Sequence, residues 1–279
     1  MASIVLFSIL LVIIKYLMQN MMKMLCSADI SISRAVNYRG KAIPAIGGMV
    51  FVPIMLIAVL LLLFLFPKNA NDYLRYLLLV LSMAFIGVVD DLLGDKRTKG
   101  FVRHFTSTLE GNMTTGFLKA LAGLLAAAIV SLGTSDGLTD FLVNVIITAL
   151  SANTINLFDL RPGRATKAYL ALSLILLYYA GTAFSAAAPL LVMIIAVIFY
   201  IRYDLGEICM LGDTGANILG ITLGYYSTVL LEADIKLLLA VTLIFVNLFS
   251  EKISISEIIS RNRLLNYIDR LGRGKKEKQ

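Results

Sequence analysis

The sequence predicts an all-α membrane protein, a polytopic bundle of about nine transmembrane helices. Three observations lead to this fold class. Of the 279 residues 59% are apolar and only 15% are charged, and the mean hydropathy is +0.86. Nine apolar stretches approach the length of a membrane span, and the basic residues gather in alternate connections between them. The core of one soluble domain cannot bury so many apolar side chains.

The apolar stretches are long enough to be spans, because a hydrocarbon core of about 30 Å needs roughly 20 residues of helix and tolerates about 17. The stretch 188–201 is the shortest, and 3–25 reads as a retained helix because it has no small-residue cleavage site. We predict one transmembrane domain over 1–249, followed by a basic, amphipathic C-terminal segment over 250–279. The nine predicted helices are 3–25, 47–66, 73–89, 116–132, 140–157, 168–184, 188–201, 216–231 and 236–249.

The distribution of Lys and Arg predicts the orientation. Nineteen of the 25 basic residues fall in the connections on one side and in the C-terminal segment, against Lys68, Arg75 and Lys236 on the other side. The positive-inside rule then places the N-terminus outside and the longer loops in the cytoplasm. The formal net charge of +7 reflects this bias, so we expect a multi-pass cell-membrane protein with no nucleic-acid partner.

Two adjacent aspartates, Asp90 and Asp91, end the apolar stretch 73–89 at the predicted cytoplasmic face. Paired carboxylates disfavour each other's ionised form unless a cation offsets them, and a hard ion such as Mg²⁺ prefers oxygen ligands. This favours a metal-assisted reaction on a phosphate at the membrane surface. The alternative is that the pair merely ends a helix and binds Lys96 and Arg97.

Two further cytoplasmic stretches carry candidate ligand-binding residues. In 37–48, Lys41 precedes a proline and a glycine pair that opens a helix, where a ligand can approach the backbone. In 153–165, polar side chains gather at the end of a helix: Asn153, Asn156, Asp159, Arg161 and Arg164. The amides can bind a nucleobase or ribose, or join helices to one another. The arginines can clamp phosphate, or serve topology alone.

A third stretch, 211–220, places Asp213 before an apolar helix. Asp213 can cap that helix, or it can hold a metal while the amides of Thr214 and Gly215 receive a diphosphate. Gly220 and Gly224, four residues apart on the same helix, are expected to be packing glycines.

Together these motifs resemble the polytopic polyprenyl-phosphate N-acetylhexosamine-1-phosphate transferases, which include the phospho-N-acetylmuramoyl-pentapeptide transferase and the transferases that begin teichoic-acid and O-antigen synthesis. The similarity spans roughly 35–231. It rests on the GK..P..GG stretch at 40–48, Asp90-Asp91, the N..NL.D element at 153–159 and GDTG at 212–215, in this order and on one predicted side of the membrane.

The resemblance implies Mg²⁺-dependent transfer of a sugar-1-phosphate from a UDP-sugar to a polyprenyl phosphate, with undecaprenyl phosphate as the expected lipid and UMP as the second product. Mn²⁺ is an alternative cofactor, and a homodimer is left open. By motif, Asp213 would be the metal ligand and Asp90 would activate the lipid phosphate, with Asp91 beside it. Lys119 would bind phosphate, and Asn156 and Asp159 would lie at the nucleotide.

The chain also departs from the family. Pro162 stands where the family usually has a second aspartate, and the histidine-rich loop is missing, since His104 is the only histidine. In its place, apolar residues repeat at helical spacing between arginines over 251–274, typical of an interfacial amphipathic helix. A lipid-binding or assembly factor without catalysis therefore stays a rival interpretation, and a transporter is the other one.

Overall fold

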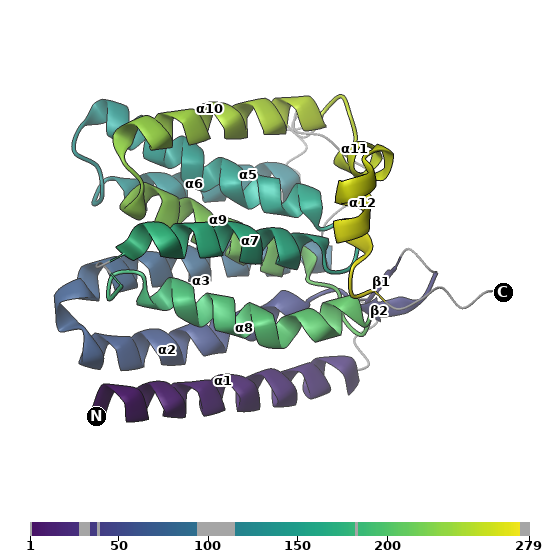
Figure 1. Cartoon of the computed structure of the whole chain (residues 1–279), viewed down its shortest axis with the longest axis horizontal. Helices are drawn as coiled ribbons and strands as arrows, with labels where there is room; N and C mark the ends of the chain where they lie inside the picture. The colour runs from purple at the N-terminus through teal and green to yellow at the C-terminus, as the bar shows by residue number, and fades with distance from the viewer. Residues whose placement is uncertain (1, 28–33, 38–39, 94–114, 182–183, 274–279) are drawn as a thin grey trace.

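The computed structural model describes residues 2–27, 34–37, 40–93, 115–181 and 184–273. Within them lie eleven α-helices, nine of which run side by side as a bundle (Figure 1). Each of the nine predicted apolar segments corresponds to one bundle helix, so the positions of the helices are confirmed to within a few residues. That all nine cross the membrane stays a prediction. The bundle helices are α1 (Ala2–Ser27), α2 (Phe51–Leu65), α3 (Ala70–Leu93), α5 (Thr115–Ser131), α6 (Leu138–Phe158), α7 (Arg164–Ala180), α8 (Ala188–Leu205), α9 (Gly212–Leu230) and α10 (Ala233–Ser250).

The chain is a multi-pass membrane protein. Six helical stretches in the described residues are long and apolar enough to cross a bilayer: Phe7–Ser27, Gly47–Leu65, Pro67–Leu92, Leu138–Phe158, Ala188–Leu205 and Ala233–Ser250. Helix α5 is apolar but shorter, and α7 has only 17 residues. Helix α9 is long enough, with 19 residues, but it is more polar than the six.

The position of α9 explains its polarity. This helix packs against α3, α6 and α7, and it is buried along almost its whole length. Its side chains therefore meet protein, not lipid, and they need not be uniformly apolar. A Cβ atom at Gly220 or Gly224 would run into the backbone of α6 at Ala152 or Thr148, which confirms that both glycines serve packing.

Short elements connect the bundle helices. Strands β1 (Arg34–Val36) and β2 (Ala42–Pro44) pair antiparallel in a small hairpin that the sequence analysis did not predict. Two strands of three residues are too short to show an alternating apolar pattern. Two 3₁₀ turns, η2 (Gly47–Val50) and η3 (Pro67–Asn69), lead into α2 and α3.

The C-terminal segment differs from the expected single amphipathic helix. It forms two short helices, α11 (Ile255–Arg261) and α12 (Arg263–Arg270). Asn262 between them is extended, and its side-chain oxygen accepts hydrogen bonds from the backbone N–H groups of Leu264 and Leu265. This cap starts a new helix and breaks the old one. Helix α12 runs across the ends of the bundle helices (Figure 1).

Candidate functional site

The two ends of the bundle each gather charged side chains. We call the end where α3 and α6 finish and α5 and α9 begin the Asp213 end; it lies on the right in Figure 1. The opposite end, where α6 and α10 begin, is the Asp140 end. All the residues singled out from the sequence as site candidates belong to elements that meet at the Asp213 end.

The first and last family-like motifs are joined by backbone hydrogen bonds. The N–H groups of Gly47 and Gly48 donate to the carbonyls of Met210 and Leu211 over 3.0 and 2.9 Å, and the Met210 N–H donates to Pro44. Gly212 has a φ of +73° and lies so close to Ala45 that a Cβ atom would overlap its carbonyl oxygen. Glycine is therefore required at the start of α9.

Helix α3 meets α9 where Gly87 packs on the Thr214 backbone, with no room for a Cβ atom. One turn further along α3, Asp91 accepts hydrogen bonds from the Asp213 N–H at 2.8 Å, the Thr214 N–H at 2.9 Å and the Thr214 hydroxyl at 2.6 Å. Asp91 thus caps α9 from a different helix, whereas the sequence offered Asp213 as a candidate for that cap. The Thr214 amide is occupied by a protein carboxylate, so this part of the expected diphosphate site is wrong.

Lys119 joins two of the candidate carboxylates. Its ammonium lies 2.6 Å from an Asp213 carboxylate oxygen and 3.4 Å from one of Asp90. The three residues come from three helices: Asp213 from α9, Lys119 from α5 and Asp90 from α3. Their side chains are 31%, 15% and 17% exposed, in that order. The structure thus brings together Asp90, Lys119 and Asp213, which are far apart in the sequence. Lys96, Arg97 and His104 lie outside the described residues.

Further carboxylates lie next to this group. Asp159, at the end of α6, accepts a hydrogen bond from the Gly212 N–H, and burial together with the charges of Asp204, Asp213 and Asp91 holds its pKa well above the usual range. Asp204, at the end of α8, is buried and accepts a hydrogen bond from the Thr166 hydroxyl. Asp204 was not predicted from the sequence. Its position at the end of an apolar segment, like that of Asp90, was the available signal.

The donor atoms at this site suit a hard cation. No group of three or more His, Cys, Asp or Glu side chains in the described part of the chain is arranged to hold a metal ion. Mg²⁺, however, is commonly held by one or two carboxylates, with water and substrate phosphate completing its shell. Asp90 and Asp213 both face the Lys119 ammonium, so they fit that two-carboxylate mode.

The other predicted ligand-binding residues are less tightly gathered. Lys41 is exposed directly before β2. Its backbone N–H donates to the Asn37 side chain, and its carbonyl accepts from the Asn37 N–H. The Asn153 side chain donates to Asn247 of α10 over 2.6 Å, the helix-joining role that the sequence left open. Asn156 is half-buried in the last turn of α6, three residues before Asp159.

The two arginines that follow have different surroundings. Arg161 is exposed in the turn between α6 and α7. Arg164 is only 6% exposed, because it forms a two-pronged ion pair with Asp269 of α12, at 2.7 and 3.1 Å, and donates to Ser256. The structure therefore uses Arg164 to hold the C-terminal segment, and it does not leave its guanidinium open to a substrate phosphate.

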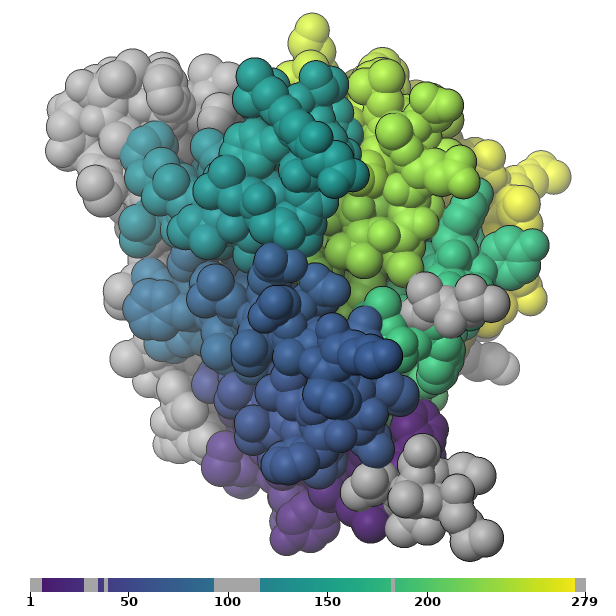
Figure 2. Space-filling view, turned by 90° about the vertical axis from the view of Figure 1, so that its left-hand side faces the viewer, coloured from purple at the N-terminus to yellow at the C-terminus, as the bar shows by residue number. Residues whose placement is uncertain are grey.

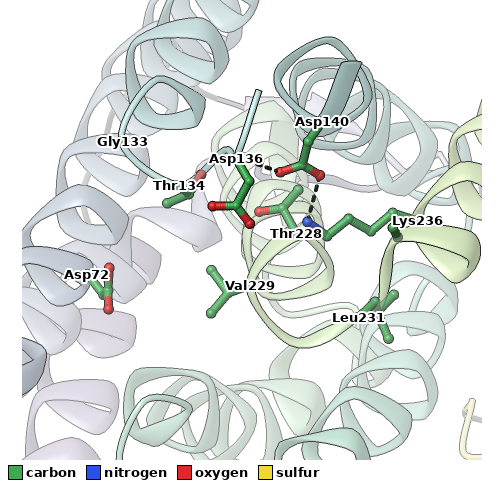
Figure 3. A pocket seen from close by; sticks show the side chains of 10 residues that line it. Asp72, Gly133, Thr134, Asp136, Asp140, Thr228, Val229, Leu231 and Lys236 are labelled. Atoms are coloured by element: carbon green, nitrogen blue, oxygen red, sulfur yellow. Dashed lines mark hydrogen bonds and ion pairs between the residues drawn. The ribbon is translucent and has the colours of Figure 1, made fainter. Parts of the chain in front are cut away.

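The Asp140 end contains a cavity of about 540 Å³. Figure 2 views this end, where the segments of α5 and α6 (teal) and α10 (yellow-green) meet α3 (blue). Asp140 and Lys236 line the cavity and form an ion pair of 2.9 Å (Figure 3). Asp140 also accepts hydrogen bonds from Asn144 and from the Asp136 backbone.

Comparison with known proteins adds no relative from which a function can be transferred. A scan against models of protein families finds no match, and a search of curated proteins finds no significant similarity.

Proposed function

We propose that this protein transfers a sugar-1-phosphate from a UDP-sugar to a polyprenyl phosphate, releasing UMP, at its Asp213 end. Support comes from one observation above all. Asp90, Lys119 and Asp213 come from three separate helices, yet both carboxylates lie within 3.4 Å of one ammonium. Two carboxylates and a lysine, converging at the edge of an apolar bundle, suit a reaction between two phosphate groups.

The surroundings of each residue indicate its role in this reaction. Asp90, in the last turn of α3, would take the proton of the acceptor phosphate or orient it. Lys119 would neutralise phosphate charge as the new bond forms. Asp91 is a positioning residue, because its oxygens are already bonded to the start of α9. Asp159, which accepts a hydrogen bond from the Gly212 N–H, and Asn156, three residues earlier, would lie toward the nucleotide.

The proposed cofactor is Mg²⁺, held by Asp213 with Asp90 close by. When bound, it would neutralise the donor diphosphate, and phosphoryl transfer depends on such neutralisation and on in-line placement more than on covalent chemistry. Asp213 is suited to this role because, within the described residues, the Lys119 ammonium is the one ion-pair partner of its carboxylate. Asp91, in contrast, is committed to the N–H groups and the hydroxyl at the start of α9.

The proposal includes a topology. All nine bundle helices would cross the membrane, with the N-terminus outside and the Asp213 end in the cytoplasm, since nineteen basic residues belong to that side. A bacterial plasma membrane, with undecaprenyl phosphate as acceptor and cell-envelope glycan synthesis as the pathway, fits this arrangement. A reporter fused after Lys278 should be active only in the cytoplasm; activity only outside would contradict the orientation.

The test is a screen of the purified protein against several UDP-sugars with undecaprenyl phosphate and Mg²⁺, measuring UMP release. We expect release with at least one donor, dependent on both the lipid and the metal, and lost in Asp90→Asn. If the protein binds undecaprenyl phosphate but releases no UMP with any donor, the lipid-binding or assembly role replaces the proposal. Retained release in Asp90→Asn, with an unchanged pH profile, would remove Asp90 from its assigned role.

A further inference from the structure

Helix α12 is attached to the bundle along one side only. Asp269 is 9% exposed and pairs with Arg164 of α7 and, at 2.6 Å, with Arg273. Lys167 of α7 donates to the carbonyls of Ile268 and Asp269 in the last turn of α12 and to that of Leu271 just after it. These bonds hold the helix in a defined orientation. They therefore fix which face of α12 points away from the bundle.

The other side of α12 is an exposed apolar stripe. Leu264, Tyr267, Ile268 and Leu271 are 67%, 66%, 47% and 52% exposed. Their spacing of three and four residues places them on one helix face. In a bundle helix such a face would lie against lipid tails. Helix α12, however, runs across the bundle axis at its end (Figure 1), where hydrocarbon gives way to headgroups.

Basic residues flank this stripe. Arg263 and Arg270 are both exposed and are seven residues apart, so they lie on one side of the stripe. Among the described residues neither makes an ion pair, whereas Arg261 pairs with Glu257. Three lysines follow in 275–278. An apolar face with a basic edge, parallel to the membrane plane, complements a layer of anionic headgroups above acyl chains.

We propose that α12 is a membrane-surface element that buries its apolar stripe at the headgroup boundary and binds anionic lipid through Arg263 and Arg270. The Arg164–Asp269 ion pair fixes the position and the rotation of α12 relative to the bundle. This inference is independent of the proposed transferase activity, because it concerns where a helix lies and which lipids it contacts.

The test measures the depth of α12 in reconstituted bilayers. Tyr267→Cys is made in a Cys26→Ser background and labelled with an environment-sensitive fluorophore; Cys209 has no exposed surface and is kept. We expect quenching by lipids that carry a spin label near the headgroup, and poor quenching by an aqueous quencher. Thr139→Cys, exposed at the start of α6, is the matched control and should respond mainly to the aqueous quencher.

Charge is tested in the same labelled protein. Quenching by the lipid label should rise when phosphatidylglycerol is added to phosphatidylcholine, and Arg263→Gln/Arg270→Gln should lose that rise. Lys68→Gln, which removes an exposed charge at the other end, should keep it. Both arginines are exposed, so size-exclusion profiles should stay unchanged. A Tyr267 label open to the aqueous quencher in both lipid mixtures would overturn the proposal, and a rise that survives in the double variant would overturn its headgroup-binding part.

Discussion

The two ends of the bundle each carry a lysine–aspartate pair between helices, but the pairs have different surroundings. At the Asp140 end, Lys236 meets Asp140 at 2.9 Å, and the remaining capacity of that carboxylate is used by Asn144 and a backbone N–H. At the Asp213 end, one ammonium is shared by Asp90 and Asp213, and Asp159 lies close enough to interact with the charges of Asp213, Asp91 and Asp204.

The difference separates a structural ion pair from a candidate reaction centre. A carboxylate that is paired with one cation and accepts hydrogen bonds from amide groups is satisfied by the protein alone, and it stabilises the helices that it joins. Carboxylates that outnumber their described cations attract additional positive charge. The Asp140 end has a cavity of about 540 Å³, yet we expect the chemistry at the other end, because one cation there faces two carboxylates.

The two ends should differ most when one aspartate is neutralised at each of them. Asp213→Asn should reduce UMP release by about a hundredfold or more, because the variant loses the charge that attracts the metal at the transition state. Asp140→Asn should leave UMP release within a few-fold of the parent. Equal losses in both variants, with normal size-exclusion profiles, would show that the two ends are not functionally different.

The lysines offer the reverse experiment. Lys236→Met leaves a partly buried carboxylate without its cation, so it should lower the free energy of unfolding by about 1–3 kcal/mol, measured by denaturation in detergent, with turnover kept. Lys119→Met should instead lower turnover while Mg²⁺ saturates the protein at a lower concentration, since a competing positive charge is gone. A raised Mg²⁺ requirement in Lys119→Met would contradict the shared-charge argument.

A smaller effect is expected where Asp91 caps α9. Asp91→Asn replaces one acceptor oxygen with an NH₂ group that faces the Thr214 donors, and loss of such a cap costs about 1 kcal/mol of stability. The matched control is Asp72→Asn at the other end, whose ion pair with Arg75 is more exposed and worth about 0.5 kcal/mol. Thermal unfolding of both variants checks the order; a larger loss in Asp72→Asn would reverse the assignment.

The smallest effect concerns pH. Although burial opposes it, the hydrogen bonds and charges of Arg164 and Arg273 hold the pKa of Asp269 below its usual value. The folded protein therefore gains stability from ionised Asp269 above the pKa of the unfolded chain, and loses that gain as the pH falls through the lowered pKa. The difference in melting temperature between the parent and Asp269→Asn should shrink on acidification. A difference that grows toward acid pH would have the wrong sign.

Much of this molecule could be predicted from the sequence, because hydrocarbon imposes simple conditions. A membrane helix must be apolar and about 20 residues long, so composition alone located all nine bundle helices. Asp90, Asp91 and Asp213 also stood out, since charges at the edge of apolar segments are few. Lys119 was identified only through the family resemblance, because a lysine near a helix start is otherwise unremarkable.

The partners of those residues were decided by the tertiary structure. Asp90 and Asp91 are adjacent and chemically identical, yet successive residues of a helix point about 100° apart, so Asp91 meets the backbone of α9 while Asp90 faces Lys119. Asp269, 105 residues from Arg164, carries no local signal of its role. Local apolarity along the chain was enough to predict where each bundle helix lies, because a helix that faces lipid or a buried core must be mainly apolar along its length. Which carboxylate caps and which meets the lysine was decided only by how the helices pack, since contacts between distant segments leave no mark on a single local pattern.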